Sequence, residues 1–467
     1  MLRYFSRSEF NRLRLFVDSP FFNKNAKLRK LIQYIDQYVP QFDQQDFTYE
    51  NAYRFVIGKE AYQKEVITKL LSKLFDLTEQ FVFHDQLKKD STAKKLALLK
   101  FYNQHNLINY FKSCHKQLNK TQQASTIKDE HWAFHQLQIE HEYAHFLSAN
   151  SDHGTGDINL QATNDALDHF FIQKKLKYFC FIKNRERLVN LPYQLTFEKA
   201  VNEHIKNVEP NVLIWKNAFD LLCIPDAMEN YQQLKANLLQ YADQIGTSDK
   251  RVLYTYLQNA TKYAFDDYSE ELFALYKIQL RQGLLYENDY LLPITFKNIV
   301  SLALHLKQYE WTEEFILTHH HNILPSHKDS TGIYLLCKAL FYFAKKNYSQ
   351  ALEELNQARI HNLYAKLEER RLRLKIYLEL DYRSLFEDGV NSSRKFLSEH
   401  RTQIASYYLK ASRNFLNIIF QLFNAAQYDR PRFDKLRKQV AAMDILPEKE
   451  WIIEKIDERN KDQREES

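Results

Sequence analysis

The sequence predicts an all-α protein built from long helices joined by short turns. Glycine occurs 7 times and proline 9 times in 467 residues, whereas average usage is roughly 7% and 5%. Many-turned sheets and glycine-rich phosphate loops need frequent tight turns, so both are disfavoured. Apolar residues make up 45% of the chain, which is ample for a large core. A helix-pair repeat in the second half favours a solenoid of antiparallel helix pairs, preceded by an N-terminal helical lobe.

Local capping signals place the helices of the first half. Ser6 and Glu9 form a capping-box pattern at the start of the first helix. Thr48 is expected to cap the third helix and Gly58 to end it. The other helices of this half are predicted at about 24–39, 62–86, 91–123, 127–149 and 157–189. Three prolines are predicted to lie near helix starts: Pro192, Pro210 and Pro225.

A repeat becomes visible from about residue 249. Four helical stretches each precede a short polar turn and a tyrosine, which opens a second helix of about 14–18 residues. The tyrosines are Tyr268, Tyr309, Tyr348 and Tyr382, spaced by 41, 39 and 34 residues. The first helices are predicted at 249–264, 290–306, 329–345 and 364–379. One helix pair cannot bury both its faces, so neighbouring pairs must stack to form a continuous core.

The C-terminal part continues this helical pattern. Helices are predicted at about 401–425 and 431–443, followed by a last helix that begins after Pro447. The sequence after Asp457, ERNKDQREES, contains no apolar residue, so we expect it to fray.

The unit LLCKALFYFAKKNYSQALEELNQA, residues 335–358, resembles a tetratricopeptide repeat. Ala339 and Tyr342 occupy the small and aromatic positions of its first helix. The second helix matches at Tyr348, Ala351, Leu355 and Ala358. The unit departs from the motif where Ala339 and Lys346 stand in place of the usual glycines. The neighbouring unit before it has Thr312 and His319 in place of the two alanines. The resemblance implies a right-handed superhelical solenoid. With SPFFN near the start and YEWTEEF at 309–315, the chain is also similar to large uncharacterised helical-repeat proteins of Bacteroidetes.

Three regions are predicted along the chain. Residues 1–125 form a basic N-terminal helical lobe, residues 126–248 a helical connecting region, and residues 249–467 the repeats and C-terminal helices. The segment 150–156, with two of the seven glycines, is predicted to be a hinge loop in the connecting region. Four cysteines without a C-x-x-C pair, and no signal peptide or apolar run long enough to span a membrane, predict a cytoplasmic protein.

The positive charge of the chain lies in its first quarter. Residues 1–125 hold 21 Lys/Arg and 12 Asp/Glu, although the whole chain has a net charge of only +6. A stripe of three lysines, Lys112, Lys116 and Lys120, is predicted on a helix whose opposite face is apolar. This stripe is the candidate partner-binding site, for nucleic acid or another polyanion. The alternative is a solvated helix face, because lysine is a common surface residue of helices.

The sequence HEYAH at 141–145 matches the H-E-x-x-H pattern of zinc hydrolases. On a helix, His141 and His145 would offer two ligands and Glu142 a general base. The glycine and histidine of the extended motif are absent, since Ser148 and Ser151 stand at those positions. We therefore favour a polar stripe on the helix predicted at 127–149, between two apolar faces. One of these faces is predicted to include Ile127 and Phe134. No metal or other cofactor is expected.

A second histidine cluster, His319 to His321, is predicted at the frayed end of the helix opened by Tyr309. A partly protonated imidazole is expected there, since it would suit the helix dipole.

The favoured function is a non-enzymatic helical-repeat scaffold that binds a protein or peptide partner in a groove lined by the first helix of each pair. The alternative is anion or nucleic-acid binding through the lysine-rich N-terminal surface. A zinc hydrolase using residues 141–145 is the third hypothesis.

Overall fold

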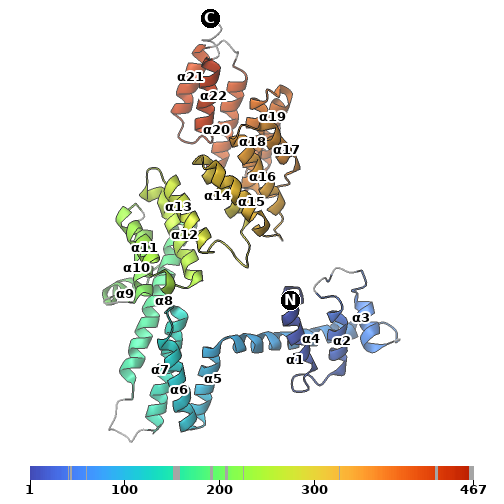
Figure 1. The fold of residues 1–467 in the computed structure, drawn as a ribbon, viewed down its shortest axis with the longest axis vertical. Coiled ribbons are helices and arrows are strands. Elements are labelled where there is room, and N and C mark those ends of the chain that lie inside the picture. Colours follow the sequence, from blue (N-terminus) through green and yellow to red (C-terminus); the bar gives the residue numbers. More distant parts are fainter. Residues whose placement is uncertain are drawn as a thin grey trace. The chain divides into compact units, whose positions relative to one another are not determined.

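The computed structural model describes residues 1–39, 42, 45–58, 60–150, 158–189, 193–205, 209–224, 226–325, 327–425 and 430–461. Across these ranges the chain is helical, with two isolated β-bridges and no strand (Figure 1). The predicted all-α fold class is therefore confirmed. None of the described helices is long and apolar enough to cross a membrane.

The chain groups into two compact units. Unit 1 contains residues 1–182, 191–215 and 241–245, and unit 2 contains residues 183–190, 216–240 and 246–467. The three regions inferred from the sequence stay a prediction. Most of the hinge segment predicted at 150–156 lies outside the described residues, and only Asn150, the last residue of α7, is described.

Unit 1 begins with four helices that share one apolar core. They are α1 (Arg7–Asp18), α2 (Ala26–Asp36), α3 (Tyr49–Ile57) and α4 (Lys64–Lys89). The capping box of Ser6 and Glu9 is present at the start of α1. Thr48 caps α3, and Gly58 ends it with a φ of 112° that favours glycine. The local signals read from the sequence are thus confirmed in this part of the chain.

One predicted helix is two helices. In place of a single helix over 91–123, the chain forms α5 (Ser91–Gln104) and α6 (Ile108–Gln123), which pack against each other. The turn is made by Asn106 in the left-handed region, at φ 52°, and Leu107 N–H donates to the Tyr102 carbonyl. The helix is interrupted here without a glycine or a proline, so the interruption was not predicted from the sequence.

Five helices of different lengths follow α6 in the first half of the chain. They are α7 (Glu130–Asn150), α8 (Leu160–Val189), α9 (Glu198–His204), α10 (Pro210–Cys223) and α11 (Met228–Gln240). Pro210 is the first residue of α10, as predicted, while Pro192 and Pro225 lie outside the described residues. Within unit 1, α7 contacts both α5 and α6.

Unit 2 contains the predicted helix pairs. They are α12 (Thr247–Ala264) with α13 (Ser269–Arg281), α14 (Pro293–His305) with α15 (Tyr309–His319), α16 (Ser330–Ala344) with α17 (Tyr348–Gln357), and α18 (Leu363–Glu379) with α19 (Arg383–Glu399). Each repeat tyrosine is the N-cap or the first residue of a second helix. Helix α16 contacts α14, α17 and α18, so first helices of neighbouring pairs pack together. Three second helices, of 13, 11 and 10 residues, are shorter than predicted.

The chain ends with α20 (Ser406–Phe423), α21 (Arg430–Ala441) and α22 (Lys449–Lys461). The fraying predicted after Asp457 is wrong as far as Lys461. Arg459 donates to the Leu422 carbonyl at 2.7 Å, and Asp457 pairs with Arg437 at 2.8 Å. These contacts tie the last turns to α20 and α21; residues 462–467 lie outside the described residues.

Helices in unit 2 end with one recurring turn geometry. A residue with positive φ follows the helix, and the next N–H donates to the carbonyl five residues earlier at 2.8–2.9 Å. These residues are Gly283, Lys307, Lys346 and Asp381. Because three of the four are not glycine, the low glycine content is compatible with these sharp helix ends.

Candidate functional site

The lysine stripe lies on the exposed face of α6. Lys112, Lys116 and Lys120 are exposed, and none pairs with a carboxylate of the described part of the chain. The opposite face is buried through Phe111, Cys114 and Leu118. The three lysines lie on one face of a helix whose opposite face is apolar, as predicted. A role in binding stays a prediction.

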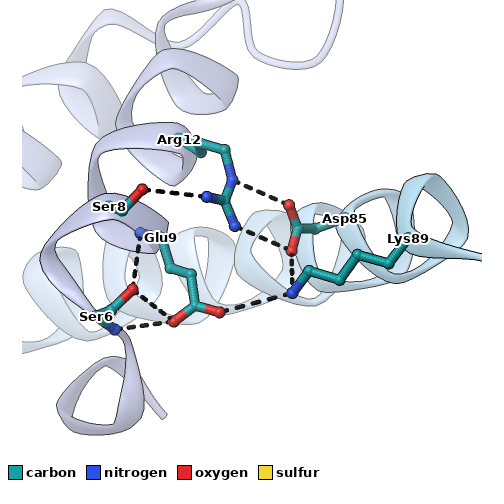
Figure 2. Close-up of polar contacts among 6 residues, drawn as sticks. All are labelled: Ser6, Ser8, Glu9, Arg12, Asp85 and Lys89. Carbon is teal, nitrogen blue, oxygen red and sulfur yellow. Dashed lines mark hydrogen bonds and ion pairs between the residues drawn. The ribbon is translucent and has the colours of Figure 1, made fainter.

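Several other cations of the N-terminal lobe pair with carboxylates within the lobe. Figure 2 shows Arg12 on α1 reaching Asp85 on α4, with an Nε to Oδ1 distance of 3.1 Å, while Lys89 reaches Asp85 at 2.9 Å and Glu9 at 3.7 Å. Hydrogen bonds from Lys89 and Arg12 hold the pKa of Asp85 below its usual range. The backbone N–H and hydroxyl of Ser6 do the same for the pKa of Glu9.

Arg7 and Arg14 complete this pattern, since both pair with Asp36 of α2 at 2.8 Å. The arginines of α1 therefore join helices of the lobe. The exposed lysines of α6, in contrast, form no ion pair among the described residues.

The H-E-x-x-H residues lie together on α7. The rings of His141 and His145 are exposed, with centroids 4.5 Å apart. Glu142 accepts a hydrogen bond from Asn103 Nδ2 of α5 at 3.1 Å. Across the described ranges, no group of three His, Cys, Asp or Glu side chains is placed to hold a metal ion. Glu142 therefore has a structural partner between α5 and α7.

The two apolar faces predicted for α7 differ in burial. On one face, Ile139 and Phe146 are buried. On the other face, Ala144 is buried, while Phe134 is 43% exposed and Ile127, which precedes α7, is 37% exposed. The second apolar face is therefore only partly covered, because periodicity shows which residues share a side and neighbouring helices decide how much of that side is buried.

The second histidine cluster ends α15 at His319 and continues as a 3-10 turn over His320–Asn322. The Tyr286 hydroxyl lies 2.7 Å from His319 Nδ1. Burial lowers the pKa of His319, which favours the neutral ring. Burial of His319 therefore acts against the partly protonated imidazole that was expected at this position.

Unit 2 contains a groove with a volume of about 600 Å³. It is formed by the first helices α14, α18 and α20 and by the segment 444–447 between α21 and α22. Four exposed residues of its lining are aromatic or aliphatic: Ile294, Tyr364, Tyr407 and Tyr408 are between 40% and 59% exposed. Two polar residues of the lining, Asn298 and Asp444, are exposed as well. None of these residues was predicted from the sequence as part of a site.

Three tyrosines form one cluster in this groove. The ring centroids of Tyr364 and Tyr408 are 4.9 Å apart, and those of Tyr407 and Tyr408 are 5.4 Å apart. Tyr364 lies in the first turn of α18, while Tyr407 and Tyr408 lie in the first turn of α20. The first turns of α18 and α20 thus bring the three tyrosine rings together.

The charged side chains of the groove are mostly paired. Lys297 on α14 binds Glu368 on α18 with an Nζ to Oε2 distance of 2.6 Å. Arg371 binds Glu448 at 3.2 Å. Asp444 is exposed and has no ion-pair or hydrogen-bond partner among the described residues. One carboxylate of the lining is therefore left without a cation.

The C-terminal helix α22 follows directly after the segment 444–447 that lines the groove, and it packs against α18. Glu448, just before α22, accepts a hydrogen bond from Lys375 of α18 at 2.6 Å. Trp451 Nε1 donates to Glu379 at 2.9 Å, and Lys455 pairs with the same carboxylate at 2.7 Å. The side of α18 towards its C-terminus is covered by α22, whereas its first turns border the groove. In the sequence, polar side chains recur every three or four residues from Tyr364 to Glu379. This spacing places them on one side of α18, and it was the signal that could have identified this surface.

Comparison of the sequence with family models, curated proteins and solved structures gives no match to any of them.

Proposed function

We propose that the chain is a non-enzymatic helical-repeat scaffold that binds a segment of a protein partner in the groove between α14, α18 and α20. The observation that carries this proposal is the cavity of about 600 Å³ lined by first helices of three pairs and by exposed tyrosines. Grooves of this kind in stacked helix pairs accommodate extended or helical peptides.

The helix pairs from α12 to α21 support a right-handed superhelical solenoid as the architecture of this scaffold. Helix α14 packs on α16, and α16 packs on α18, as stacking in series requires. None of the four cysteines is joined in a disulfide, and three of them are buried. Cysteines without disulfides support the proposed cytoplasmic location, where the environment is reducing.

Partner capture with a groove variant tests this function. The wild-type chain and the Tyr407→Glu/Tyr408→Glu variant are used to capture proteins from an extract of the native organism. Tyr263→Glu, at a tyrosine that is 50% exposed on α12, is the matched control. We expect one or more proteins to bind wild type and the Tyr263 variant, and to be lost from the groove variant while its circular dichroism is unchanged. Equal recovery by all three chains would contradict the proposal.

The alternative function is binding of nucleic acid or another polyanion through α6. The observation that favours it is the exposure of Lys112, Lys116 and Lys120 without a carboxylate partner in the described part of the chain. Lysines one turn apart, about 6 Å, match a row of phosphates.

A further inference from the structure

We propose that the groove of unit 2 recognises a basic side chain, an arginine or lysine flanked by an apolar residue, in the peptide that it binds. This inference rests on the proposed function and specifies the chemistry of the partner. It is carried by the pairing of charges in the groove, by the tyrosine cluster and by the anchoring of the segment that holds Asp444.

The charges of the groove favour a cationic ligand. Both cations of the lining are already neutralised, Lys297 by Glu368 and Arg371 by Glu448. Asp444 has no such partner among the described residues. An acidic peptide would meet no free cation in the lining and would be repelled by Asp444. A basic side chain would form the ion pair that this carboxylate lacks.

The tyrosine cluster supplies the second feature of a cation site. Tyr364, Tyr407 and Tyr408 are each at least 40% exposed in the groove and lie within 5.4 Å of a neighbouring ring. The face of an aromatic ring attracts a guanidinium or ammonium group because the ring quadrupole is negative there. A carboxylate and several aromatic rings lining one cavity therefore match a cation better than a neutral polar group.

The segment that carries Asp444 is held in place. Asn414 of α20 donates a hydrogen bond from Nδ2 to the Ile445 carbonyl at 2.8 Å. This bond fixes residues next to Asp444 against the helix that carries Tyr407 and Tyr408. Ile294, at 42% exposure, gives the groove an apolar side chain for the residue next to the bound cation.

Selection of random peptides tests the inference. Random dodecapeptides displayed on phage are selected on the full-length protein and counter-selected on its Tyr407→Glu/Tyr408→Glu variant. We expect the selected peptides to share an arginine or lysine next to an apolar residue. Synthetic copies are then measured by fluorescence anisotropy against wild type, against Asp444→Asn and against Glu313→Gln, which neutralises an exposed carboxylate on α15 outside the groove.

The expected result is a loss of affinity of about tenfold for Asp444→Asn, the size typical of one charge-assisted hydrogen bond, and no loss for Glu313→Gln. Replacing the basic residue of the peptide by glutamine should have the same effect on wild type and little effect on Asp444→Asn. Peptides that depend on the tyrosines but lack a shared basic residue would overturn this inference and leave the proposed function standing. Failure to select any peptide that depends on the tyrosines would count against both.

Discussion

Small side chains at single positions decide how closely the helices of one pair approach. Ala339 of α16 and Ala351 of α17 are both fully buried, and the two helices are in contact. At Gly332 of α16, an added Cβ would lie 2.0 Å from the Arg359 carbonyl oxygen. The chain leaving α17 therefore passes directly over the start of α16, and only glycine leaves room for it. The small residues predicted from the sequence, Ala339 and Ala351, are buried in the same core, whereas the close approach at Gly332 was not predicted.

Ala351→Leu tests the register of this pair. Three added carbons have no space at a fully buried site, so the free energy of unfolding should fall by about 1–3 kcal/mol. Chemical denaturation of both chains measures it. Ser349→Leu, at an exposed position of the same helix, is the control and should be nearly neutral. An unchanged stability for Ala351→Leu would show that α16 and α17 do not cross at this residue.

Lys346→Gly tests the strained turn after α16. Lys346 has a φ of 59°, a conformation that costs a residue with a Cβ about 1 kcal/mol and glycine almost nothing. The substitution should therefore raise the free energy of unfolding by up to about 1 kcal/mol. The neighbouring Lys345→Gly, at a φ of −83°, should lower it instead. If both variants lose stability in thermal melts, the turn does not have this geometry.

Among whole elements, α22 shows how a terminal helix is held by charge as well as by apolar contacts. Its buried residues Ile452 and Ile456 join the core of the last helices. Glu448 binds Lys375 and Arg371 just before the helix begins. Burial raises the pKa of Glu448, but the charges and hydrogen bonds of these two residues outweigh it and bring the pKa to about 2. The ionised carboxylate is therefore part of the contact between α22 and α18.

Glu448→Gln should lower the free energy of unfolding by about 1–3 kcal/mol at neutral pH, since two cations lose their partner. The folded-state pKa lies below the ordinary 4.5, so this stabilisation is present above pH 4.5 and is lost as the pH falls towards 2. Wild type and variant should therefore converge in acid. Urea denaturation at several pH values measures the difference. The exposed neighbour Glu450 provides the control Glu450→Gln, and a difference independent of pH would refute the role of this carboxylate.

The zinc-hydrolase hypothesis concerns the H-E-x-x-H residues of helix α7. Its two exposed imidazoles offer two ligands, while Glu142 is bound by Asn103. We expect the protein to purify without stoichiometric zinc, which elemental analysis by mass spectrometry measures. One tightly held zinc per chain that disappears in His141→Ala would favour the zinc-hydrolase hypothesis over the scaffold.

For the molecule as a whole, the distribution of charge is the feature that distinguishes the two main hypotheses of function. The net charge is +6. In the N-terminal lobe, arginines of α1 are paired with carboxylates of α2 and α4, as Figure 2 shows for Arg12. The lysines of α6 face solvent. Exposed charges of this kind contribute little to stability, so they are free either to bind an anion or only to keep the chain hydrated.

The triple variant Lys112→Glu/Lys116→Glu/Lys120→Glu separates these outcomes. We expect it to fold as wild type does and to retain every native partner, because the groove of unit 2 carries the proposed function. Pull-downs at low and moderate salt measure the partners of both chains. A partner that is lost from the variant, and lost from wild type as salt rises, would assign the function to α6, because the release of counterions drives such binding.

The helices and their repeat were determined by the sequence itself. The starts of α1 and α3 and the four tyrosine-led pairs follow from caps, turns and periodicity, which act over one or two helix turns. The α5–α6 turn was missed because neither glycine nor proline marks it. Its one signal is Asn106, a residue type that adopts positive φ more readily than most others. The exposure of Lys112, Lys116 and Lys120 also follows from one helix alone.

The groove was decided only by the tertiary structure. Its lining comes from α14, α18, α20 and the segment 444–447, which are separated by as many as 150 residues of sequence between Ile294 and Asp444. Whether a polar stripe such as that of α18 is solvated, paired or open depends on which distant helix packs beside it. The contact of Glu142 with Asn103 has the same origin. Local chemistry fixes where each helix begins and ends, whereas packing between distant helices fixes which side chains meet and which remain available to a partner.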